Sequence, residues 1–566
     1  MTPTRLTALA AGAVLLGAAL VFGIGRYPLL EPDEGRNAEV AREMAASGDF
    51  VVPHLDGLPY PDKPVLYFAA AALSIRAFGA TALAARLPAL VATLLTLVLI
   101  AVFARRRYGD RGGWIAVIVA GTAPLTIAFA HTVIFDSMLA LFVTAAVLGF
   151  ALSAEASERS GPNAWLWSTG AWGAIGLGIL TKGPIAIALP LLVVLPWAVW
   201  RKRVRAVLDP VGILLATAIV APWVLAMSRR VPGFIHYALA TETLERLTTP
   251  ALARTGPIWY FLPIILAGAL PWSLVLLAGS RKTWATLKAR DTDAALLVAW
   301  VLIPLVFFSL SQSKRPQYLV PLMPAVGLLV AHLWSSGGRL SGVRTAAWGM
   351  AALGVTLGLG ATSLARAFGA GPAVLAAAPG AGWALAACCV IGAALALSAP
   401  THPVVAVLGL AFPVATLPVS GGGLLGEVAR ERSSQEIAQA IRPLLGDATR
   451  VVAAGAFPLS LPYYLGRTVL LASPDAGELT SNYLVRSPAS RYVEGTPLRP
   501  ADWWRDAMIS CDRPVIVVVR QNDRARRAVL DVRVPLLIET PRYAVYGPCG
   551  KSNRALTPHP NAQGAP

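Results

Sequence analysis

Long apolar runs alternate with short polar loops over the first three quarters of the chain. Most runs approach twenty residues, and an α-helix of that length crosses roughly 30 Å of hydrocarbon. We predict thirteen spans, at 7–24, 82–104, 113–130, 137–153, 165–181, 184–200, 207–228, 257–279, 294–310, 318–335, 345–365, 380–398 and 403–420. The pattern therefore predicts a polytopic α-helical integral membrane protein.

The first apolar run has a second interpretation, because a cleaved signal peptide also contains such a run. Here the run is long, and a charged loop with an amphipathic segment follows it directly. We therefore favour an uncleaved first span.

Basic residues divide the loops between the two sides of the membrane. Clusters such as 105–107 and 201–203 occur at alternate membrane exits. The positive-inside rule assigns these loops, together with the N-terminus, to the cytoplasm. Loop 31–63 then faces outside, and an odd number of spans leaves the C-terminal tail outside too. This outer face is the periplasm or the outside of the cell.

Composition agrees with a membrane protein. Hydrophobic residues make up 56% of the chain and charged residues 14%, with a mean hydropathy of +0.62. Ordinary soluble domains are about 45–50% apolar and about 25% charged. The net charge of +18 raises the question of nucleic-acid binding. Much of the excess lies in short cytoplasmic loops, where it orients helices and meets anionic head groups, so we expect membrane lipids and no nucleic acid as partners.

Two segments of the first outside loop, 31–81, differ from the spans. Val40, Ala41 and Met44 form an apolar stripe within 33–46, which predicts a helix lying in the membrane interface. Residues 64–78 are mostly apolar but short and contain Arg76, so we predict a second interfacial or partly inserted helix. An ordinary short span is the alternative for 64–78.

The composition changes after residue 420. Short β-rich runs, such as 451–454 and 514–519, then alternate with helix-like stretches around 433–445 and 500–509. This alternation predicts a periplasmic α/β domain at 424–566, after a transmembrane domain at 1–423 that includes loop 31–81. Cys511 and Cys549 both lie in the outside domain, where an oxidising compartment permits a disulfide without requiring one.

An ordered series of motifs runs through the membrane part. It consists of Glu31-Pro32-Asp33-Glu34, Ala38-Glu39-Val40-Ala41-Arg42-Glu43-Met44, Ser47-Gly48-Asp49, Val52-Pro53-His54-Leu55, Pro61-Asp62-Lys63-Pro64, Phe135-Asp136-Ser137, Leu180-Thr181-Lys182-Gly183 and Leu270-Pro271-Trp272. In order and spacing the series resembles the lipid A aminoarabinose transferases, which are bacterial relatives of the protein O-mannosyltransferases. The resemblance implies the GT-C glycosyltransferase fold.

The resemblance also implies a reaction. It is an inverting transfer of 4-amino-4-deoxy-L-arabinose from undecaprenyl phosphate to a phosphate group of lipid A, with no cofactor and no protein partner implied. The product carries a cationic sugar in place of anionic charge, which gives resistance to polymyxin-type peptides.

Two other functions stay open. The closest is another polyprenyl-phosphate sugar transferase, of the protein O-mannosyltransferase type, acting on protein or on a different glycan. The Pro61-Asp62-Lys63-Pro64 motif favours the aminoarabinose reaction, because mannosyltransferases typically carry a histidine-proline-proline version there. A transporter is more remote, since transporters usually hold their charged sites near the midplane and here the charges crowd one outside surface.

Asp33 is our first candidate for the catalytic carboxylate. Breaking the bond between the sugar and its lipid phosphate develops positive charge on the sugar and negative charge on the phosphate. Asp33 matches the essential acidic position of the family. For a phosphate acceptor, which needs no base, we expect it to orient the amino sugar or acceptor and to stabilise the positive charge. A helix N-cap is the structural alternative.

Two more residues complete the predicted catalytic group. Asp136 begins the fourth span and is expected to face the same cavity, with a water-facing helix cap as its alternative. Arg36 follows Asp33 by one helical turn and is expected to steady it or contact phosphate. Snorkelling to head groups is the alternative for Arg36.

Lys63 is our first candidate for binding the donor phosphate, and Lys182 and Arg246 are further candidates. For Lys182 and Arg246, anchoring to lipid head groups is the alternative explanation. The remaining residues that we expect to line the substrate path are Glu34, Tyr260, Lys314, Arg315 and Tyr318. Interfacial aromatic belts are an equal explanation for the tyrosines.

A metal requirement is left undecided by the sequence. The outside histidines include no pair with tight ligand spacing, although the carboxylate-rich loop 31–63 has groups that hold divalent ions. We predict a mechanism that does not require a metal.

Overall fold

The computed structural model describes residues 3–159, 163–245, 255–335, 342–398, 402–486 and 495–549. These form two compact units. The helical unit comprises Met1–Tyr27, Met44–Pro53 and Pro61–Val428, and the sheet unit comprises Pro28–Glu43, His54–Tyr60 and Ala429–Pro566. The domains predicted at 1–423 and 424–566 stay a prediction. The compact units differ from them in a way that composition could not indicate. They divide the first outside loop between them.

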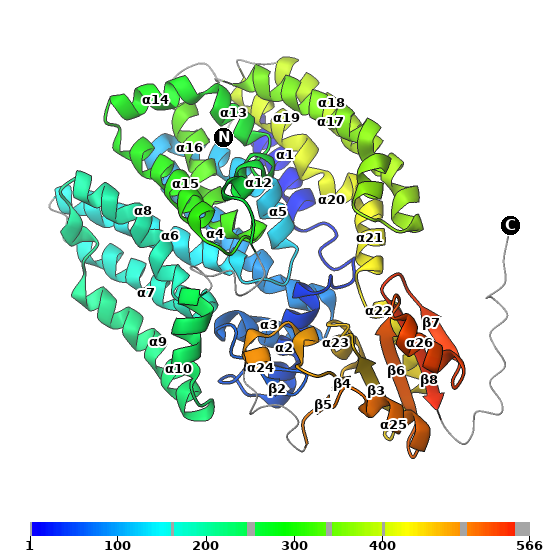
Figure 1. Cartoon of the computed structure of the whole chain (residues 1–566). Helices are drawn as coiled ribbons and strands as arrows, with labels where there is room; N and C mark the ends of the chain where they lie inside the picture. Colours follow the sequence, from blue (N-terminus) through cyan, green and yellow to red (C-terminus); the bar gives the residue numbers. More distant parts are fainter. Residues whose placement is uncertain are drawn as a thin grey trace. The chain divides into compact units, whose positions relative to one another are not determined.

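Helices make up the helical unit (Figure 1). They are α1 (Pro3–Leu20), α3 (Leu66–Phe78), α4 (Ala82–Gly121), α5 (Pro124–Ala130), α6 (Asp136–Glu158), α7 (Ala164–Lys182), α8 (Ile185–Trp200), η1 (Val204–Ala206), α9 (Pro210–Arg230), α10 (Phe234–His236), η2 (Tyr237–Glu245), η3 (Ile258–Tyr260), α12 (Phe261–Gly268), α13 (Trp272–Ala278), α14 (Ser280–Lys288), α15 (Thr292–Leu310), η4 (Pro316–Leu322), α16 (Met323–Ser335), α17 (Val343–Ala367), α18 (Pro372–Ser398), α19 (Pro403–Ala415) and α20 (Leu417–Ser420). Helices α2 (Asp33–Ser47) and α21 (Gly422–Glu431) contain residues of both units.

Many of these helices are suited to cross a membrane. Among the described residues, eight are long and apolar enough by length and composition, or up to nine if a bent pair counts as one span. Shorter apolar helices lie at Leu9–Leu20, Leu66–Phe78 and Ile185–Trp200. The count of thirteen spans therefore stays a prediction. The chain is a multi-pass membrane protein.

Helix α4 contains the predicted span 82–104 and the first part of the predicted span 113–130, whose remainder lies in α5. It runs for 40 residues, but Gly109 within it has φ 72° and ψ 179°, which interrupts the helix. A glycine adopts this conformation without the penalty that a side chain would add. The interruption lies between 82–104 and 113–130, as the two separate apolar runs predicted.

The predicted single span at 257–279 is bent in the structure. Instead of one continuous helix, the chain forms Ile258–Gly268 and Trp272–Ala278, which meet at 105°. Pro271 lies at the break, and proline lacks the N–H that would continue the helical hydrogen bonds. The Ser273 hydroxyl donates to the Leu266 carbonyl across the bend, at 2.7 Å.

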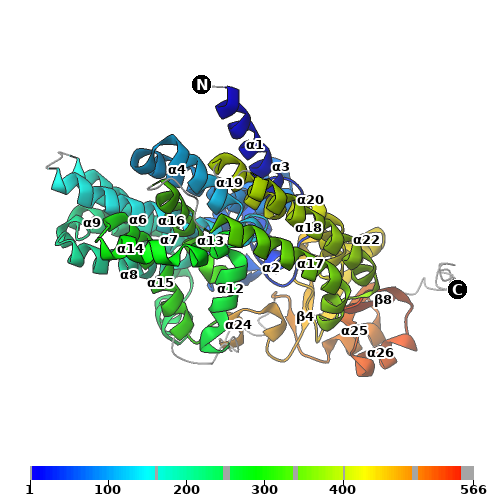
Figure 2. The same ribbon diagram turned by 90° about the horizontal axis from the view of Figure 1, so that it is seen from above.

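Central helices of the unit pack closely. Helix α16 lies along α4, and α6 packs against both α4 and α7. At Gly327 of α16, an added Cβ would come within 2.7 Å of the Ala116 carbonyl oxygen of α4. Small residues permit such an approach between membrane helices. By contrast, α17 and α18, which run side by side in Figures 1 and 2, have much of their surface exposed.

The predicted short helix at 64–78 is present as α3 (Leu66–Phe78). Its thirteen residues span only about 20 Å, which is less than the hydrocarbon thickness. Tyr67, Phe68, Ala71, Ala72 and Ile75 are buried. The length agrees with an interfacial helix better than with a span.

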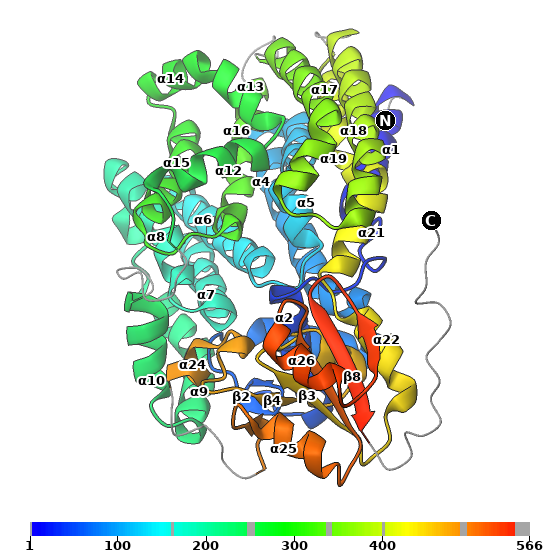
Figure 3. The same ribbon diagram turned by 45° about the vertical axis from the view of Figure 1, so that its right-hand side comes forward.

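A six-stranded mixed sheet forms the centre of the sheet unit (Figure 3). Its strands are β3 (Arg450–Ala454), β4 (Leu470–Ala472), β5 (Leu498–Arg499), β6 (Val515–Arg520), β7 (Leu536–Glu539) and β8 (Tyr543–Cys549), in the order β5-β4-β3-β6-β8-β7. Strands β5, β4, β3 and β6 are parallel, and β8 is antiparallel to both β6 and β7. A separate hairpin joins β1 (His54–Leu55) to β2 (Leu58–Pro59).

The helical segments that accompany the sheet are α22 (Gln435–Ile441), η5 (Arg442–Leu444), α23 (Leu461–Leu465), η6 (Gly477–Leu479), α24 (Asn482–Arg486), α25 (Trp503–Ser510) and α26 (Arg524–Asp531). On one face of the sheet, Val452 and Val517 pack with Trp504 of α25 and Leu530 of α26. Residues of the opposite face, such as Ile516 and Val518, are also fully buried. Burial on both faces is typical of parallel sheets, and it confirms the predicted α/β alternation.

Cys511 and Cys549 form a disulfide, which answers the question left open by the sequence. The bond links the residue after α25 to the last residue of β8. Cys388 and Cys389 are free.

Candidate active site

A cavity of about 430 Å³ lies in the helical unit. Apolar side chains such as Leu139, Ile187, Trp223 and Phe307 form most of its wall. The charged residues that line it are Asp62, Lys63, Asp136, Lys182 and Glu242. An apolar cavity with a few charged groups is the usual form of a site for an amphipathic ligand.

Lys63 lies in the segment between β2 and α3, where the chain enters the cavity wall. Its ammonium forms an ion pair with Glu242 Oε2 at 2.6 Å and donates to the Asp62 carbonyl at 2.6 Å. The Tyr237 hydroxyl donates to the Asp62 carboxylate and lies 3.4 Å from Glu242 Oε1. Lys63 is therefore held inside a polar cluster at the cavity wall.

Glu242 and Tyr237 belong to η2, a π-helical segment. Such segments are rare and are often found at functional sites. Asp62, Tyr237 and Glu242 were not among the predicted site residues. The Pro61-Asp62-Lys63-Pro64 motif was a signal for Asp62, but Glu242 is 179 residues away from Lys63 and had none.

Asp136 and Lys182 form an ion pair in the same cavity. Asp136 is the first residue of α6 and Lys182 the last of α7. The helix dipole favours a carboxylate at a helix start and an ammonium at a helix end, so both charges lie where the backbone stabilises them. The Asp136 side chain is only 1% exposed, and a carboxylate buried to this degree requires such a partner.

The two residues were predicted for separate roles, and the fold brings them together. Gly183 makes this possible, because its φ of 76° ends α7 directly after Lys182. The Lys182 ammonium also lies 5.0 Å from the centre of the Tyr318 ring. Tyr318 lines the cavity, and its hydroxyl is 3.1 Å from the Ser313 hydroxyl.

Three other predicted residues are not among those that line this cavity. The Lys314 ammonium donates to carbonyls at the end of α15, including that of Ser309 at 2.6 Å, so it caps the helix. Tyr260 packs edge-on against Phe261. Arg315 is half-buried. Arg246 lies outside the described residues.

The remaining predicted residues lie in the sheet unit. Asp33 is the first residue of α2, and its carboxylate forms an ion pair with Arg36. The second terminal nitrogen of Arg36 donates to the Thr480 hydroxyl at 2.7 Å. The predicted contact between Arg36 and Asp33 is thus present. Glu34 is buried and accepts a hydrogen bond from the Leu30 N–H at 2.9 Å.

Two buried carboxyl groups of the same unit have raised pKa values. Burial raises the pKa of Glu39 well above its ordinary value, although Arg42 binds both of its oxygens. Burial likewise raises the pKa of Asp56, against the lowering effect of the hydrogen bond from the Val469 N–H. Neither residue was predicted as functional, and both are explained by the packing of the unit.

No group of three or more His, Cys, Asp or Glu side chains is arranged to hold a metal ion within the described ranges. The carboxylates of 31–63 are instead engaged with protein partners. Glu34, Glu39 and Asp49 accept hydrogen bonds from Leu30, Arg42 and Arg230, respectively.

Two crystal structures have a similar fold. ArnT from Cupriavidus metallidurans bound to undecaprenyl phosphate aligns with a TM-score of 0.82 at 24% identity, covering 97% of this chain and 98% of that chain. The apo state of that protein aligns with a TM-score of 0.78 over 96% of this chain and 97% of that one. The chain therefore has the GT-C fold of polytopic α-helical membrane proteins, followed by an α/β unit.

Proteins of similar sequence indicate the kind of enzyme more specifically than the fold does. The undecaprenyl phosphate-alpha-4-amino-4-deoxy-L-arabinose arabinosyl transferase of Enterobacter sp. (strain 638) is 34% identical over 327 residues, and that of Yersinia enterocolitica is 35% identical over 327 residues. Each match covers 56% of this chain and 58% of the relative, so the chain matches a little over half of their length. A family model described as dolichyl-phosphate-mannose-protein mannosyltransferase matches residues 5–238. The resemblance found in the motif series is confirmed.

Proposed function

We propose that the chain is a glycosyltransferase that moves 4-amino-4-deoxy-L-arabinose from undecaprenyl phosphate to a phosphate group of lipid A. The observation that carries the proposal is the apolar cavity with Lys63, Asp136 and Lys182 in its wall. A polyprenyl phosphate donor has a long apolar tail and an anionic head, which such a cavity matches. The named activity of the arabinosyl transferase relatives supports the choice of sugar.

The reaction breaks the bond between the anomeric carbon and the oxygen of the lipid phosphate. The bonding electrons leave with the phosphate, while an oxygen of the acceptor phosphate attacks from the opposite face of the sugar and inverts its configuration. The acceptor phosphate is largely ionised near neutral pH, so no base is needed to remove a proton.

The lysines of the cavity have the chemistry for the departing phosphate. Lys63 exchanges its contact with Glu242 for the donor phosphate, and the new contact strengthens as negative charge accumulates on the leaving group. Lys182 supplies a second ammonium, which Asp136 holds in place. Tyr318 packs against this ammonium and supports its orientation.

Asp33 is assigned a different task in this proposal. Its carboxylate orients the amino sugar or the acceptor and stabilises the positive charge that develops at the anomeric carbon. The assignment rests on the position of Asp33 in the motif series and at the start of α2. Arg36 steadies the carboxylate through their ion pair.

We further propose that the reaction occurs at the periplasmic face of the bacterial inner membrane. The supporting observation is the placement of basic clusters at alternate membrane exits, which leaves the motif-rich loop 31–81 on the outer side. The modified lipid A then binds polymyxin-type peptides more weakly, because the added sugar is cationic, and the cell becomes resistant to them.

A second candidate function is sugar transfer from a polyprenyl phosphate to protein or to another glycan. The match of the mannosyltransferase family model to residues 5–238 favours it. This reaction would use the same cavity for the lipid phosphate, but it requires a base to remove a proton from the acceptor hydroxyl.

Complementation distinguishes the two functions. The full chain is expressed in a polymyxin-sensitive strain that lacks its own aminoarabinose transferase but still makes the donor, and lipid A is analysed by mass spectrometry. We expect the added amino sugar and restored resistance. Unmodified lipid A, despite normal expression of the chain and normal donor levels, contradicts the aminoarabinose reaction.

A further inference from the structure

A second cavity, of about 360 Å³, lies entirely within the sheet unit. Its wall includes Phe457 after β3, Thr480 after β4, Arg520 at the end of β6, and Arg542 just before β8. Strands β3, β4 and β6 are parallel, so their carboxyl ends meet at one edge of the sheet. We call this cavity the sheet-edge crevice.

The crevice lies where the strand order reverses. From β3 the chain continues to β4 on one side and later returns to β6 on the other side. In open α/β sheets, ligands bind outside the carboxyl ends of the strands at such a switch point, because the connections diverge there and leave a gap. The topology by itself therefore favours a binding site at this edge.

Two arginines come together at the crevice. In the ladder between β6 and β8, Arg520 pairs with Tyr543, the residue that follows Arg542. The Gln521 N–H donates to the Arg542 carbonyl at 2.9 Å, so the two chains stay hydrogen-bonded one residue beyond the end of the ladder. Arg520 and Arg542 both line the crevice, so two positive charges share one cavity, and an anion bound there offsets their mutual repulsion.

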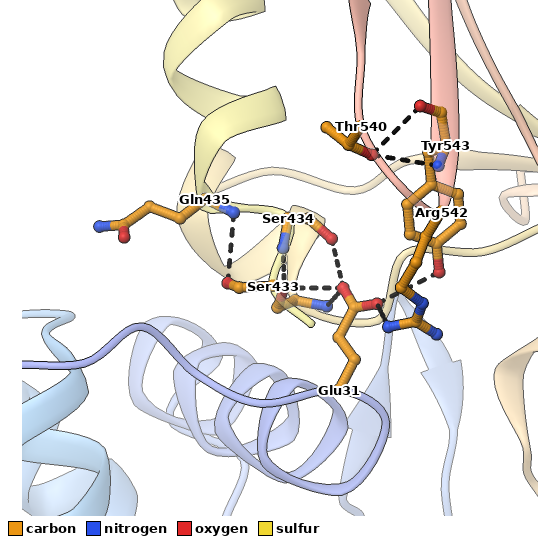
Figure 4. A network of polar contacts seen from close by, with 8 residues as sticks. Glu31, Ser433, Ser434, Gln435, Thr540, Arg542 and Tyr543 are labelled. Carbon is orange, nitrogen blue, oxygen red and sulfur yellow. Dashed lines mark hydrogen bonds and ion pairs between the residues drawn. The ribbon is translucent and has the colours of Figure 1, made fainter. Parts of the chain in front are cut away.

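Glu31 holds one of these arginines in position, as Figure 4 shows. Its Oε2 accepts from Arg542 Nη1 at 3.1 Å and from the Tyr543 hydroxyl at 3.2 Å. Its Oε1 accepts from the hydroxyls of Ser434 and Ser460 and from the Ser460 N–H. The Glu31 side chain is 1% exposed and its two oxygens receive five hydrogen bonds, so its charge is satisfied by the protein.

Donors remain for a ligand. Among the described residues, only Nη1 of the Arg542 guanidinium has a hydrogen-bond partner, and the side chain is 40% exposed. The guanidinium of Arg520 is exposed and forms no hydrogen bond or ion pair within the same ranges. A guanidinium presents its donors as a planar fork that matches the oxygens of a phosphate group.

The rest of the wall suits a sugar. Asn522 and Gln521 present amide groups, and Glu478 presents a half-buried carboxylate that accepts from the Ser473 hydroxyl at 2.5 Å. Phe457 and Pro541 add apolar surface. Hydroxyl groups of a sugar bind to amides and carboxylates, while its ring packs on apolar faces.

We infer that the sheet-edge crevice binds a phosphorylated sugar, with Arg520 and Arg542 contacting its phosphate. The group can be the head of a lipid or a soluble sugar phosphate, since both have the same chemistry. Thr480 lines the crevice and also accepts the hydrogen bond from Arg36, the partner of Asp33. A ligand in the crevice that contacts Thr480 would therefore affect the position of Arg36 in the first turn of α2. The inference does not rest on the proposed transfer reaction.

Binding to the purified full chain in detergent tests the inference, in the absence of any sugar donor. The probes are glucosamine 1-phosphate, glucosamine, and lipid A micelles with and without their phosphates, all followed by calorimetric titration. Arg520→Ala is the test variant, because this side chain is exposed and forms no hydrogen bond or ion pair among the described residues. Arg533→Ala is the matched control, an exposed arginine of the same unit that does not line the crevice.

We expect the phosphorylated probes to bind and their counterparts without phosphate to bind much more weakly. Loss of the Arg520 guanidinium group is expected to weaken binding of the phosphorylated probes by about tenfold to a hundredfold. The Arg533 variant is expected to bind like the parent chain. Arg520-dependent binding of glucosamine 1-phosphate supports a soluble ligand, and Arg520-dependent binding of phosphorylated lipid A alone supports a lipid head group.

Two results overturn the inference. One is that no phosphorylated probe shows binding to the parent chain that Arg520→Ala weakens. The other is that Arg520→Ala and Arg533→Ala weaken binding equally, which indicates a general attraction to positive charge. The readout is the dependence of binding on Arg520, which has no role in the proposed transfer reaction, so either result leaves that reaction untouched.

Discussion

The Lys63 ammonium lies 2.6 Å from Glu242 Oε2, across 179 residues of sequence. This ion pair joins the segment before α3 to the π-helical segment η2, and both residues line the apolar cavity. In the proposed reaction, the donor phosphate and the Glu242 carboxylate compete for the same ammonium.

Replacement of Lys63 by alanine is expected to lower kcat/KM for transfer by about a hundredfold or more. The reason is the loss of a cation that stabilises the leaving phosphate in the transition state. The measurement is transfer of the amino sugar by the purified chain, together with donor affinity. Lys288→Ala is a control, since that lysine is exposed on α14 outside the cavity. An unchanged rate and donor affinity for Lys63→Ala would reject the phosphate role.

Glu242→Gln is expected to have the opposite effect on donor binding. Glutamine keeps the size of the side chain but removes the competing charge, so the donor phosphate meets an ammonium without a carboxylate partner. The donor Kd is expected to fall by about threefold to tenfold, as loss of an ion pair worth roughly 1 kcal/mol predicts. Weaker donor binding in this variant would show that Glu242 positions Lys63 rather than competing for it.

The buried pair of Asp136 and Lys182 leads to a prediction about stability. Asp136→Ala leaves the Lys182 ammonium without its counter-charge and is expected to cost about 3–5 kcal/mol in the free energy of unfolding. The double variant with Lys182→Ala is expected to cost about 1–3 kcal/mol less than the sum of the two single changes. Thermal unfolding of the four proteins in detergent measures this coupling. Strictly additive losses would contradict a direct interaction.

Asp33→Ala is expected to abolish transfer while the chain remains folded. Arg36 is buried but keeps its hydrogen bond to Thr480, so the loss of its partner should cost about 1–3 kcal/mol and leave the chain folded. Glu43→Gln, a change to another carboxylate of α2, is the matched control and is expected to leave transfer near its normal rate. Near-normal transfer by Asp33→Ala would reduce Asp33 to a helix-terminal residue.

Asp56 carries a prediction about pH. It lies in the turn between β1 and β2 with φ 54°, its side chain is fully buried, and Oδ2 has no hydrogen-bond partner among the described residues. Burial raises the pKa of this carboxyl group in the folded chain, so the folded state holds the proton more tightly than the unfolded state. The associated stability is complete below the unfolded pKa, near 3.9, and is lost as the pH rises through the folded pKa.

Asp56→Asn removes this titration, and asparagine also tolerates the positive φ. The variant is expected to raise the Tm by about 2–4 °C at pH 8 and to change it little at pH 4. Thermal unfolding of the two proteins across this pH range is the measurement. A variant that is equally destabilised at both pH values would indicate that the carboxylate has a structural role in its charged form.

Local pattern predicted most of the elements. Helix α2 follows from the apolar stripe around Val40 and Met44, but the structure buries this stripe, together with Glu39, inside the protein rather than leaving it for the membrane interface. Helix α3 follows from an apolar run too short to span the membrane. The strands β3 and β6 follow from short runs of valine and isoleucine between helix-like stretches. These features are visible in sequence because hydrophobic spacing depends on nearby residues only. The bend at Pro271 was missed, since the flanking runs are apolar enough to form one span.

For the candidate site, too, sequence motifs identified residues, whereas their contacts appeared only in the structure. The motif series alone identified Asp33, Lys63, Asp136 and Lys182, because it records residue types in a recognisable order. The ion pair of Asp136 with Lys182, the contact of Lys63 with Glu242 and the pairing of Arg520 beside Arg542 depend on how separate helices and strands pack. No local pattern encodes such contacts, since their partners are tens to hundreds of residues apart. The sequence by itself determined the class of membrane protein and its candidate residues, whereas only the tertiary structure decided which charges neutralise one another and which cavities they line.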